Sequence, residues 1–155
     1  MKPIASFCVD HRYIEPGVYL SRVDGDVVTY DLRTRKPNAG DYMDNITMHS
    51  VEHLFATYAR NSAYADRVVY FGPMGCRTGF YLLVRDMTEK EVWELILDVL
   101  DRCARHEGPM FGQSEIECGN YRELSVEAGR RECAAYRAAL VAKGMDYSYP
   151  KGDGQ

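Results

Sequence analysis

The dipeptide Asp24-Gly25, which separates two runs of β-forming residues, restricts the fold of this 155-residue chain more than any other feature. Residues 18–23 and 26–33 on either side of it are rich in valine and tyrosine. An Asp-Gly pair between two such runs is a strong short-range hairpin signal. The sequence therefore predicts two antiparallel strands and a tight turn within residues 17–33.

Apolar periodicity predicts two further strands and three helices. The strands are Val68 to Phe71 and Phe80 to Val84, on either side of a glycine- and proline-rich loop. The helices are expected from a start between Asn45 and Thr47 to about Tyr64, from the capping box Thr88–Glu91 to a stop before Gly108, and from about Ser125 to Lys143. Because strands and helices do not alternate regularly, we expect an α+β fold, with an antiparallel sheet packed against helices.

Composition limits the size and the partners of this fold. With 155 residues and 46% hydrophobic content, the chain is expected to form a single domain over residues 1–155, with residues 145–155 as a flexible tail. A net charge of −4 argues against nucleic acid and anionic membranes as partners. There is no long apolar segment and no export signal, so we expect a cytoplasmic protein.

The five cysteines are odd in number and widely spaced, which indicates free thiols. Cys103 and Cys133 fall on apolar helix faces and are interpreted as small core residues. Cys76 and Cys118 are flanked by glycine, where a flexible backbone can expose a thiol instead of burying it. His106 is placed in the last turn of its helix, where an imidazolium interacts favourably with the helix dipole.

His49-Ser50-Val51-Glu52-His53 is the candidate metal motif. Two histidines four residues apart lie on one helix face and can bind one divalent ion, and Glu52 is then close enough to transfer protons there. A pair of surface or helix-capping histidines is the alternative. A catalytic ion needs a third protein ligand, for which Cys118 is the candidate. A free surface cysteine is the alternative for Cys118.

Five motifs follow one another along the chain: Ser6-Phe7-Cys8-Val9-Asp10-His11, Asp31-Leu32-Arg33 with Pro37-Asn38, His49-Ser50-Val51-Glu52-His53-Leu54, Pro73-Met74-Gly75-Cys76-Arg77-Thr78-Gly79-Phe80-Tyr81-Leu82 and Cys118-Gly119-Asn120-Tyr121-Arg122. Together, and in this order, they closely resemble the LuxS family, S-ribosylhomocysteine lyase. The resemblance extends from about Ser6 to Leu140. Such a set of separate motifs in one order is specific.

The resemblance implies one divalent metal per subunit, held by His49, His53 and Cys118. The metal is expected to be Fe²⁺, which Zn²⁺ or Co²⁺ can replace. Glu52 and Cys76 are implied as general acid/base residues on opposite sides of the sugar. The substrate-binding residues are implied to be Ser6, His11 and Arg33, contributed by the partner subunit of a homodimer.

The implied reaction cleaves the thioether of S-ribosylhomocysteine. Two carbonyl shifts along the sugar and a β-elimination give homocysteine and 4,5-dihydroxypentane-2,3-dione, the precursor of the autoinducer-2 quorum-sensing signal. The product would serve as that signal or would only be cleared from the methyl cycle. We expect a thiolate near Arg77 and a carboxylate to move the protons. Metal would stabilise the negative charge that develops next to each carbonyl.

The chain departs from the family pattern at two places. Tyr70-Phe71-Gly72 stands where the family usually has Asp-Ile-Ser, and Thr34-Arg35-Lys36 stands where it has Phe-Cys-Gln. The first change removes a carboxylate that the resemblance would place against the substrate.

Three other interpretations of the metal motif remain. An inverted zinc peptidase also uses His-x-x-Glu-His, but in a far larger chain. A peptide deformylase uses two histidines and a cysteine, but in the reverse order. A non-catalytic metal or redox sensor would use Cys76 and Cys118, and unlike a lyase it would keep its response after replacement of Glu52.

Overall fold

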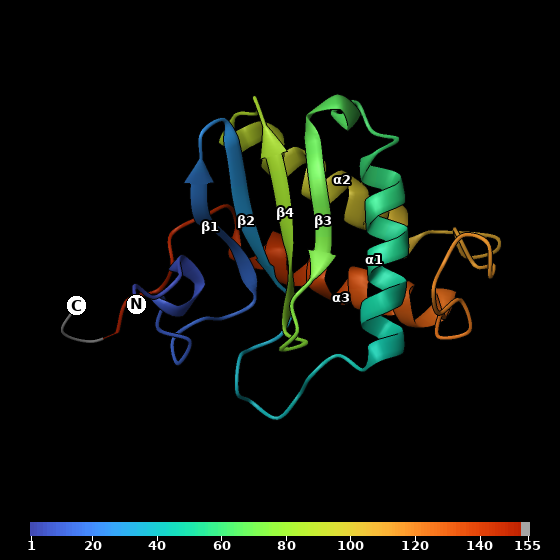
Figure 1. The fold of residues 1–155 in the computed structure, drawn as a ribbon, viewed down its shortest axis with the longest axis horizontal. Coiled ribbons are helices and arrows are strands. Elements are labelled where there is room, and N and C mark those ends of the chain that lie inside the picture. Colours follow the sequence, from blue (N-terminus) through green and yellow to red (C-terminus); the bar gives the residue numbers. More distant parts are fainter. Residues whose placement is uncertain (153–155) are drawn as a thin grey trace.

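A four-stranded antiparallel sheet in the order β1-β2-β4-β3 lies at the centre of the structure, a computed structural model that describes residues 1–152 (Figure 1). Its strands are β1 (Gly17–Asp24), β2 (Val27–Arg33), β3 (Val68–Pro73) and β4 (Gly79–Arg85). β1 and β2 form the hairpin predicted from Asp24-Gly25. The central strands β2 and β4 pair along their whole length, from Val27 with Arg85 to Arg33 with Gly79.

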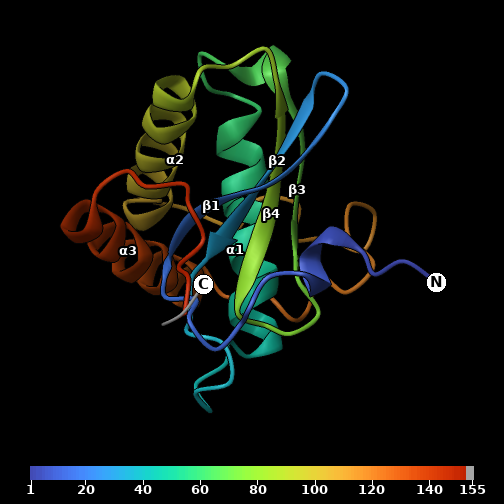
Figure 2. The same cartoon turned by 90° about the vertical axis from the view of Figure 1, so that its left-hand side faces the viewer.

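Three helices pack on the sheet: α1 (Asn45–Ala59), α2 (Glu89–Ala104) and α3 (Val126–Lys143). Figure 2 shows α2 and α3 on one side of the sheet, and on the other side the N-terminal segment with the short 3-10 helix η1 (Ala5–Phe7). A second 3-10 helix, η2 (Ala65–Arg67), precedes β3. The single-domain α+β fold expected from the sequence is confirmed. None of the helices in residues 1–152 combines the length and apolarity needed to cross a membrane.

The predicted N-terminal caps are confirmed for α2 and α3, whereas α1 is capped one residue before the predicted range. Thr88 and Glu91 form the expected capping box, and Ser125 caps α3. The cap of α1 is Asp44, whose carboxylate accepts a hydrogen bond from the Thr47 amide at 2.7 Å. This helix also ends at Ala59, earlier than predicted, because the Ser62 hydroxyl bonds the Ala59 carbonyl at 2.7 Å and favours a turn there.

The two faces of β2 have different partners. Tyr30 and Leu32 point into the helix-covered core, where they are 3% and 1% exposed. Asp31 and Arg33 belong to the opposite face, because side chains alternate along a strand. Both are nevertheless buried, at 1% and 2% exposure. A charged pair is thus buried on the face of the sheet opposite α2 and α3.

The segment after α3 differs from its expected role as a flexible tail. Tyr147 is buried, and its carbonyl accepts a hydrogen bond from the Leu20 amide at 2.9 Å. The Tyr149 ring stacks on Tyr19 with 4.8 Å between the ring centroids. Polar composition suggested fraying, but the two tyrosines provide apolar area and hydroxyl groups that hold residues 146–152 against the sheet. The last three residues of the predicted tail, 153–155, lie outside the described part of the chain.

Candidate functional site

α1 carries two of the three predicted metal ligands. His49 and His53 are one helical turn apart, with ring centroids 4.6 Å apart. Cys118 arrives from the loop between α2 and α3, and its Sγ lies 3.4 Å from His49 Nε2. One ligand atom from each of the three residues lies within 4.8 Å of the others. This His-His-Cys group is hereafter the metal trio.

Two backbone carbonyls fix the orientation of the histidine rings. His49 Nδ1 lies 2.9 Å from the Glu123 carbonyl, and His53 Nδ1 lies 2.7 Å from the Phe111 carbonyl. A carbonyl only accepts hydrogen bonds, so each Nδ1 carries a proton and each Nε2 is left on the side of the trio, where that of His49 contacts Cys118 Sγ. Two imidazole lone pairs and one thiolate suit Fe²⁺, Co²⁺ or Zn²⁺ and leave a coordination position open. The trio therefore fits a catalytic divalent ion.

His106 supports the loop that carries the Phe111 carbonyl, and does not occupy the helix end where it was predicted. It follows the end of α2, is 4% exposed, and its Nε2 donates to the Pro109 carbonyl at 2.9 Å. Its Nδ1 then accepts from the Tyr58 hydroxyl at 2.7 Å. The dipole interpretation is wrong because both ring nitrogens are occupied by neutral partners in the core.

Glu52 lies on α1 immediately before His53, and is half-buried. A residue three positions after His49 shares its side of the helix. Its sequence position therefore favours a carboxylate near the metal trio, and its role as an acid/base stays a prediction.

Cys76 is exposed at the tip of the turn between β3 and β4. The turn is closed by hydrogen bonds from the Met74 amide to the Gly79 carbonyl at 2.9 Å and from the Arg77 amide to the Met74 carbonyl at 3.0 Å. Arg77 has a positive φ of 63°. The expectation that glycine-flanked Cys76 is presented to solvent is confirmed.

The cation beside the Cys76 thiol is Arg33, not the predicted Arg77. Arg33 Nη1 lies 4.0 Å from Cys76 Sγ and donates to the Thr78 hydroxyl at 2.8 Å, and that hydroxyl is 3.1 Å from the sulfur. The Arg77 side chain instead donates to the Met43 carbonyl at 3.3 Å. Sequence proximity alone does not reveal this bond between Arg77 and a residue 34 positions away.

Asp31 holds Arg33 in place with two hydrogen bonds, of 2.6 and 3.1 Å. Burial alone would lower the pKa of the Arg33 guanidinium, but the hydrogen bonds and charge of Asp31 outweigh burial, and the pKa is above its ordinary value. Tyr149 donates a further hydrogen bond to Asp31 at 2.8 Å. Burial and the Asp31 charge raise the pKa of the Tyr149 hydroxyl, which keeps its proton and remains a donor.

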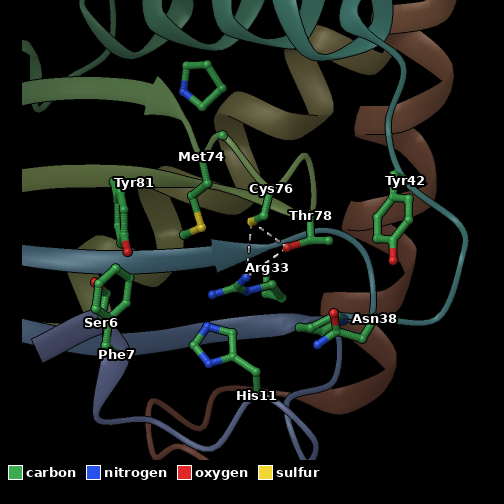
Figure 3. A pocket seen from close by; sticks show the side chains of 13 residues that line it. Ser6, Phe7, His11, Arg33, Asn38, Tyr42, Met74, Cys76, Thr78 and Tyr81 are labelled. Carbon is green, nitrogen blue, oxygen red and sulfur yellow. Dashed lines mark hydrogen bonds between the residues drawn. The ribbon is translucent and has the colours of Figure 1, made fainter.

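These residues border a cavity of about 440 Å³. Figure 3 shows Cys76 and Thr78 above the Arg33 guanidinium, with His11 below it and Ser6 beside Tyr81. The cavity lining is Ser6, Phe7, His11, Arg33, Pro37, Asn38, Tyr42, Pro73, Met74, Gly75, Cys76, Thr78 and Tyr81. We call this the thiol pocket.

The predicted site residues therefore form two groups within the described chain. Cys76 shares the thiol pocket with Ser6, His11 and Arg33, whereas Glu52 and the metal trio line none of it. Sequence reasoning missed four neighbours of Arg33 and Cys76: Asp31, Thr78, Tyr81 and Tyr149. The period-two spacing of Asp31 and Arg33 on a predicted strand was a usable signal for one of them.

The Tyr70-Phe71-Gly72 departure has a local structural explanation. Tyr70 is 52% exposed on β3, and its ring lies across Gly72. A Cβ atom at position 72 would meet the Tyr70 hydroxyl at 2.1 Å. The two changes thus accommodate each other, because only glycine leaves room for the ring in this position.

Comparison with known proteins identifies the family. The family model described as S-ribosylhomocysteinase (LuxS) matches residues 4–145. A Desulfotalea psychrophila protein named S-ribosylhomocysteine lyase is 41% identical over 142 residues, covering 88% of this chain and 89% of its own length. A Clostridium beijerinckii protein of that name is 46% identical, with 81% and 83% coverage, and one from Borreliella burgdorferi is 39% identical, with 90% and 93% coverage. The chain belongs to the LuxS family.

Proposed function

We propose that this LuxS-family protein, a carbon–sulfur lyase, cleaves the thioether of S-ribosylhomocysteine to homocysteine and 4,5-dihydroxypentane-2,3-dione. The observation that carries the proposal is the metal trio, two of whose ligands share α1 with Glu52, in a chain that also presents Cys76 in a pocket with Arg33. Relatives named for this activity match more than four-fifths of the chain. The five cysteines are free thiols, which suits the reducing cytoplasm.

His49, His53 and Cys118 would hold one divalent ion per subunit, Fe²⁺ in our proposal, with Zn²⁺ or Co²⁺ as substitutes. When bound, the ion supplies a Lewis acid for the sugar oxygens. The carbonyls of Phe111 and Glu123 support this role because they bond the Nδ1 atoms and leave the Nε2 atoms as the ligand atoms.

Glu52 and Cys76 transfer the protons in the proposed reaction. Moving a carbonyl along the sugar requires a proton to leave one carbon and another to reach its neighbour, and the final elimination requires a base at the carbon adjacent to the carbonyl. A half-buried carboxylate and an exposed thiol on separate elements can approach the sugar from two sides. Ser6, His11 and Arg33 line the thiol pocket, where they can donate hydrogen bonds to the substrate hydroxyls.

We further propose a homodimer in which the thiol pocket of one subunit faces the metal trio of the other. The separation of the two groups within one chain supports this arrangement. So does the exposure of apolar side chains on both edge strands, Leu20 and Val23 in β1 and Tyr70 in β3. A twofold axis would then generate two equivalent complete sites.

Thiol release from S-ribosylhomocysteine by protein purified without air tests the reaction. Wild type should free homocysteine, whereas Glu52→Gln and Cys76→Ala should retain the metal and lose at least about 10²-fold in kcat. Cys8→Ala is the matched control, because Cys8 is an exposed thiol outside the pocket lining. Metal binding without thiol release in wild type, even with added Fe²⁺ or Co²⁺, would contradict the proposed substrate.

Mixing the two inactive variants tests the shared site. A heterodimer of Glu52→Gln and Cys76→Ala chains has one site with both native residues if each site takes them from different subunits. Unfolding and refolding an equal mixture should then restore about a quarter of wild-type activity, since half of the dimers are mixed and half of their sites are intact. No recovery would place both residues of a site in one chain.

A further inference from the structure

Residues 146–152 lie beyond the region that matches the LuxS family, yet they are anchored along the sheet. The Tyr147 carbonyl accepts from the Leu20 amide, and the Tyr147 hydroxyl donates to the Glu89 carbonyl at 2.6 Å. Figure 2 shows this red segment passing from the end of α3 to the sheet. The segment therefore leads from the helix layer to the sheet face that carries the thiol pocket.

Tyr149 carries the contact between this segment and the charged pair of β2. Its ring stacks on Tyr19 at an angle of 16°, and its hydroxyl donates to Asp31 Oδ2 at 2.8 Å. The same oxygen accepts from Arg33 Nη2 at 2.6 Å. The Asp31 carboxylate is thus held by three donor atoms, two from Arg33 and one from Tyr149.

The charged pair transmits this contact to the Cys76 thiol. The side chains of Asp31 and Arg33 are 2% and 3% exposed, so water contributes little to their orientation. Arg33 reaches Thr78 and Cys76 with the nitrogen that Asp31 leaves free, Nη1. A small hollow lined by Tyr149 also shares Ser6, His11 and Arg33 with the thiol pocket.

We propose that residues 146–152 are a positioning segment for the thiol pocket, in which Tyr149 fixes the Asp31 carboxylate and thereby the Arg33 guanidinium beside Cys76. Removing the phenol hydroxyl leaves a buried carboxylate oxygen with a single donor and leaves more of the Asp31 charge uncompensated. Arg33 then turns further toward Asp31, and less of its positive charge acts at Cys76. The catalytic consequence of this change rests on the proposed function, but the change itself does not.

Alkylation of Cys76 measures the charge of Arg33 at the thiol directly. Iodoacetate is an anion and iodoacetamide is neutral, so the ratio of their rates at the Cys76 peptide, followed by mass spectrometry, reports the local positive potential. Tyr149→Phe keeps the ring that stacks on Tyr19 and should lower this ratio about threefold. Tyr147→Phe, which removes a hydroxyl of the same segment bonded to Glu89, should leave the ratio at the wild-type value.

The kinetic readout separates positioning from general stabilisation. Because Arg33 is proposed both to bind substrate and to place positive charge at Cys76, Tyr149→Phe should raise KM severalfold and lower kcat by a smaller factor. Tyr149→Phe in an Arg33→Lys background should hardly change KM further, because Lys lacks the several N–H donors with which Arg33 bonds Asp31 and Thr78 at once.

An unchanged alkylation ratio in Tyr149→Phe, or an equal fall in Tyr147→Phe, would overturn the proposal. If wild type releases no thiol but the ratio falls as expected, the proposed function fails and the positioning role stands.

Discussion

The metal trio and the thiol pocket use opposite means to orient their functional side chains. In the trio, two neutral backbone carbonyls hold His49 and His53 by their Nδ1 protons. In the thiol pocket, a buried carboxylate holds Arg33 by its charge. The carbonyls are neutral, so they add no positive charge to the trio that would repel a cation. In the charged pair, by contrast, the positive charge of Arg33 is balanced by Asp31 within the protein.

The two regions should therefore differ in how much their functional side chains contribute to the stability of the fold. The trio residues are half-buried, so a missing side chain there leaves no uncompensated charge in the interior. Loss of either member of the Asp31–Arg33 pair leaves the other one charged and buried. The trio should therefore tolerate replacement in the metal-free protein, whereas the thiol pocket should not.

Asp31→Asn should produce the largest effect. The replacement keeps the shape of the side chain and removes the charge that holds Arg33, so the free energy of unfolding should fall by about 3–5 kcal/mol. Cys118→Ser, measured on metal-free protein, should change it by less than about 0.5 kcal/mol. Urea unfolding of both variants beside wild type provides the comparison.

Asp24→Asn is the matched control for the charged pair. Asp24 also pairs with an arginine two residues away, Arg22 at 2.6 Å, but both side chains are 54% exposed. An exposed pair contributes about 0–1 kcal/mol, so this variant should unfold nearly as wild type does. Equal destabilisation by Asp24→Asn and Asp31→Asn would show that burial of the pair is not what stabilises the thiol pocket.

The elements that sequence predicts well are those that depend on neighbouring residues. The Asp24-Gly25 hairpin, the Thr88–Glu91 capping box and the i,i+4 histidines all arise within a few residues, and all appear in the structure. The helix boundary at Ala59 was misjudged because apolar periodicity continues past the point where the Ser62 hydroxyl turns the chain. Local patterns thus give an element and its face more reliably than its end.

The unpredicted part of the site depends on contacts between residues far apart in the chain. Arg33 meets Thr78 and Tyr149 approaches Asp31 only because β2 pairs with β4 and the chain returns to the sheet after α3. No spacing rule connects such positions. The role of His106 was predicted wrongly for a similar reason, since its partner Tyr58 lies on α1, 48 residues earlier in the chain. The metal trio combines both cases. The histidine pair could be predicted from its spacing, whereas Cys118 could be assigned to it only from ligand chemistry and from the family resemblance.

Gly112→Ala and Gly75→Ala compare the backbones of the two regions. Gly112 has a φ of +66°, and a Cβ there would lie 3.3 Å from His53 Nδ1. Alanine should therefore reduce the free energy of unfolding by about 1–2 kcal/mol and weaken Co²⁺ binding about tenfold by displacing the Phe111 carbonyl.

Gly75, in the Cys76 turn, has an ordinary φ and an open Cβ position, so Gly75→Ala should change the free energy of unfolding by less than about 1 kcal/mol. Titration with Co²⁺ and thermal unfolding would measure both, and wild-type Co²⁺ affinity in Gly112→Ala would show that the carbonyl does not position His53.

Asp44→Ala tests the smallest contribution, the cap that begins α1 ahead of the metal trio. The hydrogen bond from the Thr47 amide holds the pKa of the Asp44 carboxyl below its ordinary value. A group with a lowered folded-state pKa stabilises the protein above the unfolded-state pKa of about 4, and this contribution disappears as pH falls through the folded-state value. Asp44→Ala should therefore reduce the free energy of unfolding by about 1 kcal/mol at pH 7, and the difference from wild type should shrink below about pH 4.

Ser125→Ala is the control for this pH dependence, because it removes a helix cap that carries no charge. The Ser125 hydroxyl caps α3 by accepting from the Ala128 amide at 3.2 Å, and it does not titrate. Its replacement should cost about 1 kcal/mol with no loss of effect between pH 7 and pH 3. Chemical unfolding of both variants across this range distinguishes a charged cap from a neutral one. If Asp44→Ala lowers the free energy of unfolding as much at pH 3 as at pH 7, the Asp44 charge does not stabilise the first turn of α1. The start of α1 would then depend on uncharged contacts, like the carbonyl hydrogen bonds that orient its histidines.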